Sequence, residues 1–132
     1  MIFFEVEFHH RLIIYKRIAN AKNNSELDKL KIELIDRFGL LPNEVKLLFA
    51  VTELKIFATK LGIKKIIASL NNGYLEFTNT PNINTAQLIN LIQVHSKIYK
   101  LDGQSKLKFT LSQTNHDEKI IEIFNILKKL DN

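Results

Sequence analysis

The chain of 132 residues has no cysteine and no long apolar run. The lack of cysteine excludes disulfides, thiol catalysis and thiolate zinc sites, and it suits the cytoplasm. Because no run of about 18 apolar residues occurs, no segment is predicted to span a membrane. The opening MIFFEVEF has neither a basic leader nor a small-residue cleavage site, so it lacks the pattern of a secretion signal. We therefore expect a cytoplasmic protein.

Motifs for catalysis and cofactor binding are also lacking. The four glycines are isolated from one another, which excludes a glycine-rich phosphate loop. None of the four histidines has the spacing of a short metal motif, and no serine stands in a GxSxG context. We therefore expect no metal, no cofactor and no catalytic site, and an enzyme is only the third hypothesis after two kinds of binding domain.

The charge balance is mildly basic, with 19 Lys and Arg against 14 Asp and Glu. A net charge of +5 permits contact with nucleic acid, although no long basic run occurs. One local cluster is a candidate for phosphate contact, and it consists of Arg11, Lys16, Arg17 and Lys22 around Tyr15. The simpler interpretation of this cluster is a solvated basic helix face, and we prefer it.

The N-terminal half is predicted to be helical after an initial strand. Alternating apolar residues in MIFFEVEF predict the strand, and HHRLIIYKRIANAKN predicts a helix. The expected inward face of this helix is Leu12, Tyr15, Ile18 and Ala19. Ser25 is expected to cap a second helix, with Asp28 completing a weak capping box. Gly39 is expected to end that helix in a left-handed cap.

The core faces of the second and third helices follow from their apolar spacing. Pro42 is expected in the first turn of the third helix, and Gly62 is expected to end it. The second helix is expected to bury Leu27, Leu30, Leu34 and Phe38. The third is expected to bury Val45, Leu48, Val51, Leu54, Ala58 and Leu61.

The C-terminal half is predicted to follow the order β-β-α-β-β-α. IKKIIASL and YLEFT flank Asn72-Gly73, which predicts a type I′ hairpin turn. Asn84 or Thr85 is expected to cap the helix TAQLINLIQVH, and KIYKL and KLKFTL form a second hairpin around DGQS. HDEKIIEIFNILKKL predicts a closing amphipathic helix. The expected fold class is α+β, with N-terminal helices followed by one sheet packed against helices.

The stretch IELIDRFGLLP at residues 32–42 holds an acid that local structure does not explain. Asp36 lies in the last turn before Gly39, where the helix dipole disfavours a carboxylate by about 0.3–1 kcal/mol. At about 100° per residue it lies nearly opposite the leucine stripe, flanked by Lys29, Ile32 and Glu33. Glu33 has Lys29 and Arg37 four residues away, whereas Asp36 has no local cation. The face is therefore either solvated or a docking surface.

Several longer motifs resemble one known family. The segments RLIIYKRIANAK, ELDKLKIELIDRFGLLP, ATKLGIKKI and YKLDGQSKLKF occur in that order. Together they closely resemble the C-terminal domain of the bacterial transcription-repair coupling factor (Mfd), over roughly residues 11 to 130. The first ten residues depart from the family, which enters this domain through an acidic segment containing proline. We therefore divide the chain into a strand-like lead-in at 1–10 and one regulatory domain at 11–132.

The resemblance implies a regulatory module of a DNA-repair factor. In the family, an ATP-driven translocase displaces stalled RNA polymerase and recruits UvrA through a UvrB-like module. The C-terminal domain docks on that module and masks its UvrA-binding surface, and the helix ending in ELIDRFG supplies acidic contacts. Carried over by position, those acids are Glu33 and Asp36, and Lys29, Ile32 and Arg37 lie beside them. A nucleic-acid-binding accessory domain is the alternative, and the translocase motifs are absent from this chain.

Overall fold

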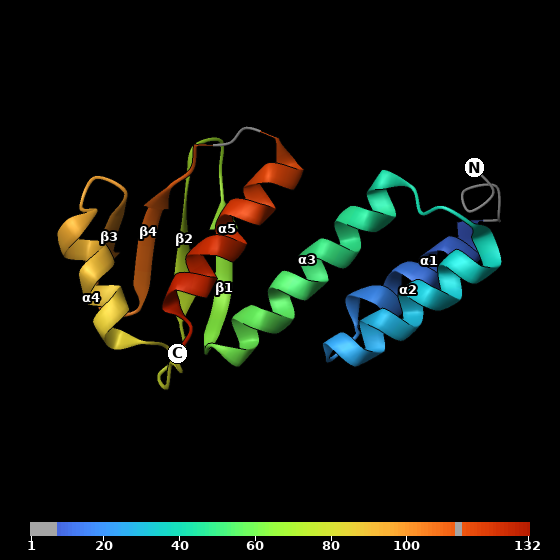
Figure 1. Ribbon diagram of the computed structural model, residues 1–132, viewed down its shortest axis with the longest axis horizontal. Coiled ribbons are helices and arrows are strands. Elements are labelled where there is room, and N and C mark those ends of the chain that lie inside the picture. Colours follow the sequence, from blue (N-terminus) through green and yellow to red (C-terminus); the bar gives the residue numbers. More distant parts are fainter. Residues whose placement is uncertain (1–7, 113–114) are drawn as a thin grey trace. The chain divides into compact units, whose positions relative to one another are not determined.

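The computed structural model describes residues 8–112 and 115–132, and the chain forms two compact units, Met1–Ile56 and Phe57–Asn132. The helices and strands are α1 (Phe8–Ala19), α2 (Asn24–Phe38), α3 (Asn43–Lys60), β1 (Ile63–Ala68), β2 (Asn72–Phe77), α4 (Thr85–Val94), β3 (Tyr99–Asp102), β4 (Lys106–Thr110) and α5 (His116–Leu130) (Figure 1). This order confirms the predicted α+β class. That residues 11–132 form one domain stays a prediction, and the predicted strand at 1–8 lies outside the described residues, except that Phe8 begins α1.

The first unit has a core built from one side of each of its helices. The buried residues of this core are Ile14, Ile18, Leu27, Leu30, Leu34, Leu41, Val45 and Phe49. The predicted stripe of α2 is confirmed, with Phe38 packed at its edge. The predicted face of α1 is wrong in part, because Ile14 is buried whereas Leu12 is 41% exposed. The consecutive apolar residues Leu12, Ile13 and Ile14 fit more than one helix face, so periodicity alone selected the wrong one.

The N-terminus of α2 is capped by residues other than those predicted. Asn23 Oδ1 accepts a hydrogen bond from Glu26 N at 2.9 Å, and Glu26 Oε2 accepts one from Lys22 N at 2.8 Å. Ser25 and Asp28 therefore do not form the cap. Asn is as good a cap as Ser, and Glu three residues later is the preferred reciprocal partner.

The loop between α2 and α3 contains the two expected punctuating residues. Gly39 ends α2 with a positive φ of 85°, but its ψ of −145° lies outside the left-handed helical region. This conformation is accessible almost only to glycine. Pro42 immediately precedes α3, and its carbonyl accepts hydrogen bonds from Val45 N and Lys46 N.

The prediction for α3 is correct at Val45, Leu54, Ala58 and Leu61, whereas Leu48 is only partly buried. Val51 is 44% exposed, and Phe49 is buried although it was not predicted to be. The sequence of α3 is apolar on more than one side, so its spacing does not define one face.

The second unit contains a four-stranded antiparallel sheet in the order β1-β2-β4-β3. One face of the sheet is buried, and its residues include Ile63, Leu75, Phe77, Tyr99, Leu107 and Phe109. The buried side of α5 supplies Ile123, Ile126, Leu127 and Leu130. Lys119 Nζ of α5 donates to Ser69 O at 2.8 Å, and Lys129 Nζ lies 5.9 Å from the centre of the Tyr99 ring. The predicted second hairpin, closing helix and Asn84 cap are confirmed.

The first hairpin turns two residues earlier than predicted. Ser69 N donates to Asn72 O at 2.7 Å, so Leu70 and Asn71 form the turn and Asn72 and Gly73 belong to β2. A type I′ turn requires positive φ at both central residues, and no described non-glycine residue has one. Gly73 instead permits close packing, since an added Cβ would lie 2.4 Å from Ile67 O and 2.9 Å from the Phe109 ring.

The same substitution at two glycines tests whether Gly73 is needed for close packing or for a turn. We expect Gly73→Asn to lower the free energy of unfolding by about 1–3 kcal/mol because the side chain overpacks the sheet. Gly103→Asn is the control, since Gly103 has φ of 71° with open space around it and asparagine tolerates that conformation. We expect its effect to stay within about 0.5 kcal/mol. Urea unfolding followed by circular dichroism measures both effects. If Gly73→Asn left the free energy of unfolding unchanged, the close-packing role of Gly73 would be wrong and the type I′ turn prediction would again be favoured.

Candidate protein-interaction surface

The outward side of α2 carries an acid surrounded by exposed apolar side chains. Ile32 is 68% exposed, Ile35 is 45% exposed, and Leu40 just beyond the helix is 82% exposed. Asp36 lies among them, one turn after Ile32 and four residues before Leu40, and it is also exposed. We call Ile32, Ile35, Asp36 and Leu40 the docking surface. Exposed apolar side chains that lie close together can mark a protein-binding site, so this side of α2 is a candidate for one.

Asp36 makes no ion pair or hydrogen bond with any side chain that the structure describes. This agrees with the absence of a cation at its neighbouring helix positions. Its location in the last turn of α2 places it near the negative end of the helix dipole. A carboxylate in that location is satisfied better by a cation from outside the helix than by the helix itself.

Glu33 is bound by a residue that the sequence did not indicate. Arg17 Nη1 of α1 donates to Glu33 Oε2 at 2.8 Å, and both side chains are partly exposed. The hydrogen bond and charge of Arg17 lower the pKa of Glu33 below its ordinary value of 4.5, and Arg37 lowers it further as the smaller contribution. The predicted partners Lys29 and Arg37 therefore do not bond to it. Sixteen residues separate Arg17 from Glu33, so no local spacing rule could have found the pair.

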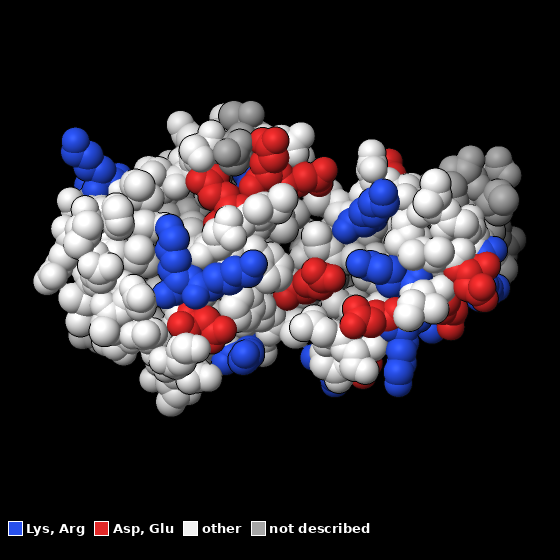
Figure 2. Space-filling model, viewed as in Figure 1, with Lys and Arg blue, Asp and Glu red and all other residues white. Residues whose placement is uncertain are grey.

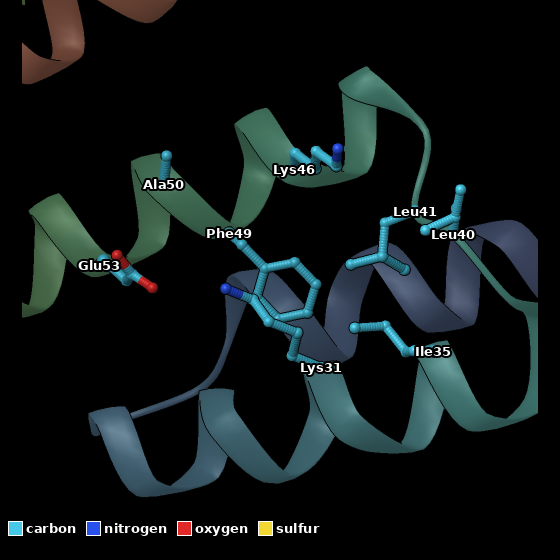
Figure 3. Close-up of a pocket in the computed structure, with 8 residues that line it drawn as sticks. All are labelled: Lys31, Ile35, Leu40, Leu41, Lys46, Phe49, Ala50 and Glu53. Carbon is cyan, nitrogen blue, oxygen red and sulfur yellow. The ribbon is translucent and has the colours of Figure 1, made fainter.

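A shallow apolar hollow adjoins the docking surface within the first unit. It lies between α2 and α3, has a volume of about 350 Å³, and shares Ile35 and Leu40 with the docking surface. Figure 3 shows Ile35 and Leu41 directed toward the ring of Phe49. Lys31 Nζ lies 5.3 Å from the centre of that ring. The hollow is large enough to receive an apolar side chain of a bound protein.

The remaining candidates on α2 are distributed around this surface. Lys29 is exposed and lines a separate groove between α1 and α2 together with Arg17 and Glu33. The guanidinium of Arg37 lies 5.2 Å from the centre of the Phe38 ring. Neither Lys29 nor Arg37 forms an ion pair or a hydrogen bond with Asp36.

The basic cluster on α1 is less available than its sequence suggests. Arg17 is engaged by Glu33, whereas Lys16 and Lys22 are exposed. The side chain of Arg11 lies outside the described part of the chain. In the view of Figure 2, acidic and basic side chains are interspersed over α1 and α2, whereas acidic side chains gather near the start of α5.

A metal site and a membrane-spanning helix are both lacking among the described residues. No group of three His, Cys, Asp or Glu side chains there is placed to hold a metal ion. Within residues 8–112 and 115–132, no helix is long and apolar enough to cross a membrane.

Comparison with known proteins identifies the family. A model of the TRCF domain matches residues 6–88, which include all of α1, α2 and α3 and the docking surface. The chain belongs to the TRCF domain family. It is 40% identical over 121 residues to a transcription-repair-coupling factor of Escherichia coli, covering 92% of this chain and 10% of that protein. The corresponding protein of Haemophilus influenzae is 38% identical over 120 residues, with 91% and 10% covered.

A solved structure shares the fold of this TRCF domain. The crystal structure of the C-terminal domain of a transcription-repair coupling factor superposes with a TM-score of 0.68 at 21% identity. The match covers 92% of this chain and 80% of that one. The chain thus spans about a tenth of the length of the two full relatives and most of the isolated C-terminal domain. The family resemblance seen in the sequence is confirmed.

Removing Arg17 tests the observed ion pair directly. We expect the pKa of Glu33 to rise toward 4.5 in Arg17→Gln, because both its hydrogen bond and the nearby charge are lost. The matched variant Arg37→Gln should raise it less, since Arg37 contributes only a weaker charge effect. The pair stabilises the fold above pH 4.5, and this contribution disappears as the pH falls through the lowered pKa of Glu33. Carboxyl NMR titration of Glu33 measures these changes, and a larger shift in Arg37→Gln would contradict the pairing.

Proposed function

We propose that this chain is the regulatory, autoinhibitory interaction domain of a transcription-repair coupling factor. In this role it docks on the UvrB-like module of the same factor and masks the surface that binds UvrA. It would act in transcription-coupled DNA repair in the cytoplasm. The chain itself would catalyse no step, and ATP-driven translocation would belong to other parts of a full-length factor. Membership of the TRCF domain family supports the setting, and the geometry of α2 supports the docking role.

The observation that carries the proposal is the state of Asp36. Its carboxylate is exposed, has no partner among the described side chains, and is surrounded by Ile32, Ile35 and Leu40. An arginine can bind a carboxylate through two parallel hydrogen bonds. Apolar side chains around such a pair exclude water when a partner docks, and a charge pair that is removed from water is stronger than a solvated one. Asp36 would therefore be the principal acidic contact.

Glu33 would have a secondary role. Because Arg17 already binds it, a cation of the partner would either share Glu33 with Arg17 or replace Arg17. Either exchange yields less free energy than the pairing of an unpartnered acid, since one existing interaction is weakened while the other forms. The two acids are therefore expected to contribute unequally, with Asp36 contributing more.

The contacts available suit a reversible clamp. A single unpartnered acid and a shallow hollow of about 350 Å³ offer only a small number of contacts to a partner. Charge pairs near the rim of an interface contribute modestly to affinity. Such a domain can hold a resting state and still yield when another ligand binds the open state better. A domain that masks a surface must bind in this way, because it has to stay docked at rest and be released when the factor binds its next ligand.

Single substitutions of acids on α2 test the docking role. We expect Asp36→Ala to weaken binding to the UvrB-like module of a full-length relative about tenfold, which corresponds to about 1.4 kcal/mol. Asp28→Ala removes the same charge from an exposed position of the same helix outside the docking surface and should leave binding unchanged. Glu33→Ala should have an effect smaller than that of Asp36→Ala. Isothermal titration calorimetry measures all three.

Two results of that experiment would refute the role of Asp36. One is equal binding by the unaltered chain and Asp36→Ala. The other is equal weakening by Asp28→Ala and Asp36→Ala, which would indicate a response to net charge alone. Circular dichroism of each variant confirms that the helices remain folded.

A further inference from the structure

The sheet of the second unit has a face opposite the buried one, with a different character. Strand pairing aligns Ile67, Tyr74, Lys108 and Lys100 in one row across the four strands. A second row aligns Lys65, Glu76, Lys106 and Asp102. Leu75 and Leu107 are directed to the opposite, buried side, as the alternation of strands requires. We call these two rows the open sheet face.

The open sheet face carries a strong excess of positive charge. Four lysines lie in its two rows, namely Lys65, Lys100, Lys106 and Lys108. Lys64 of β1 lies beside them, and Lys97 lines the hollow described below. In the part of these rows and of the hollow that the structure describes, two acids accompany them, and each is already paired. Glu76 lies 3.5 Å from Lys64 Nζ, and Asp102 lies 3.6 Å from Lys108 Nζ. Among the described residues, Lys65, Lys97 and Lys100 have no carboxylate partner, so the face is left with unneutralised cations.

The arrangement of the lysines is unfavourable for the sheet alone. Lys100 is directly opposite Lys108 on the neighbouring strand, and like charges in that position destabilise a sheet. Lysines on edge strands often prevent aggregation, which accounts for those of β1 and β3. It does not account for Lys106 and Lys108, because β4 is an inner strand. An anionic ligand over the face would relieve this repulsion.

A hollow of about 440 Å³ lies on the same face. Ile67, which is 39% exposed, and Tyr74 provide apolar surface within it, and Lys97, Lys100 and Lys108 line it. Lys106 Nζ lies 4.9 Å from the centre of the Tyr74 ring. An aromatic ring among lysines offers a surface for a base together with charges for phosphates.

We propose that the open sheet face binds single-stranded nucleic acid. The lysines would contact the phosphate backbone, and Tyr74 and Ile67 would contact bases in the hollow. The residues of this site belong to the second unit, whereas Asp36 and the basic cluster on α1 belong to the first. This proposal does not depend on the proposed docking function, so an experiment can refute one of the two and leave the other standing.

Matched charge reversals test the location of the site. The probe is a fluorescent oligothymidine of about 15 nucleotides, bound to the full chain at low salt and followed by anisotropy. We expect Lys100→Glu with Lys108→Glu to weaken binding at least tenfold. Lys16→Glu with Lys22→Glu makes the same change in net charge on the first unit and should weaken it less than threefold. The second pair also examines the α1 cluster.

The salt dependence of the unaltered chain tests the proposal without a variant that perturbs the fold. Each phosphate contact to a single strand contributes a slope of about −0.7 in log K against log salt. We expect a slope near −3 for about four contacts, and Lys100→Ala should reduce its magnitude by about 0.7. Backbone amide NMR shifts caused by the oligothymidine should gather on β2, β3 and β4.

Several outcomes would overturn the proposal. These are no oligothymidine binding at low salt, equal weakening by the two charge-reversed pairs, tighter binding of a duplex of the same length, and amide shifts confined to α1. Binding of polyglutamate in place of oligothymidine would likewise refute it and would indicate an acidic protein partner.

Discussion

Burial of the leucine stripe of α2 is the constraint on which the first unit depends. Leu27, Leu30 and Leu34 occupy one side of the helix, and all three are buried. Full burial of each leucine stabilises the fold by about 1.5–3 kcal/mol, whereas an acid near the C-terminus of a helix costs about 0.3–1 kcal/mol. Packing therefore fixes the rotation of α2, and Asp36 faces outward regardless of its cost. The docking surface is a consequence of this core.

The sequence predicted the features that depend on strong local patterns. The stripe of α2, the outward position of Asp36 and the span of the closing helix were correct, because each rests on helical periodicity or a cap. Features decided by tertiary contacts were not predictable. Gly73 is required because a side chain there would clash with Ile67 O and the Phe109 ring, not because of a turn, and Arg17 reaches Glu33 from another helix. The cap was wrongly assigned to Ser25 because Asn23 is an equally good cap nearby. Leu12 was wrongly predicted to be buried because the apolar residues of α1 fit more than one helix face.

The two units present outward surfaces of opposite electrostatic character. An unpartnered acid among apolar side chains marks the first, and lysines around Tyr74 mark the second. In each unit the core fixes which side of an element faces outward, and at least one charged side chain on that side has no charged partner among the described residues. A protein cation suits the first surface and a phosphate backbone suits the second.

Isoleucine methyl NMR of the chain with the UvrB-like module tests the docking account most directly. Ile32 and Ile35 flank Asp36, whereas Ile67 lies on the open sheet face, so each surface has its own exposed reporter. We predict that addition of the unlabelled module shifts the methyl signals of Ile32 and Ile35 and leaves that of Ile67 unchanged. A complex in which Ile67 shifts while Ile32 and Ile35 do not would contradict docking through Asp36.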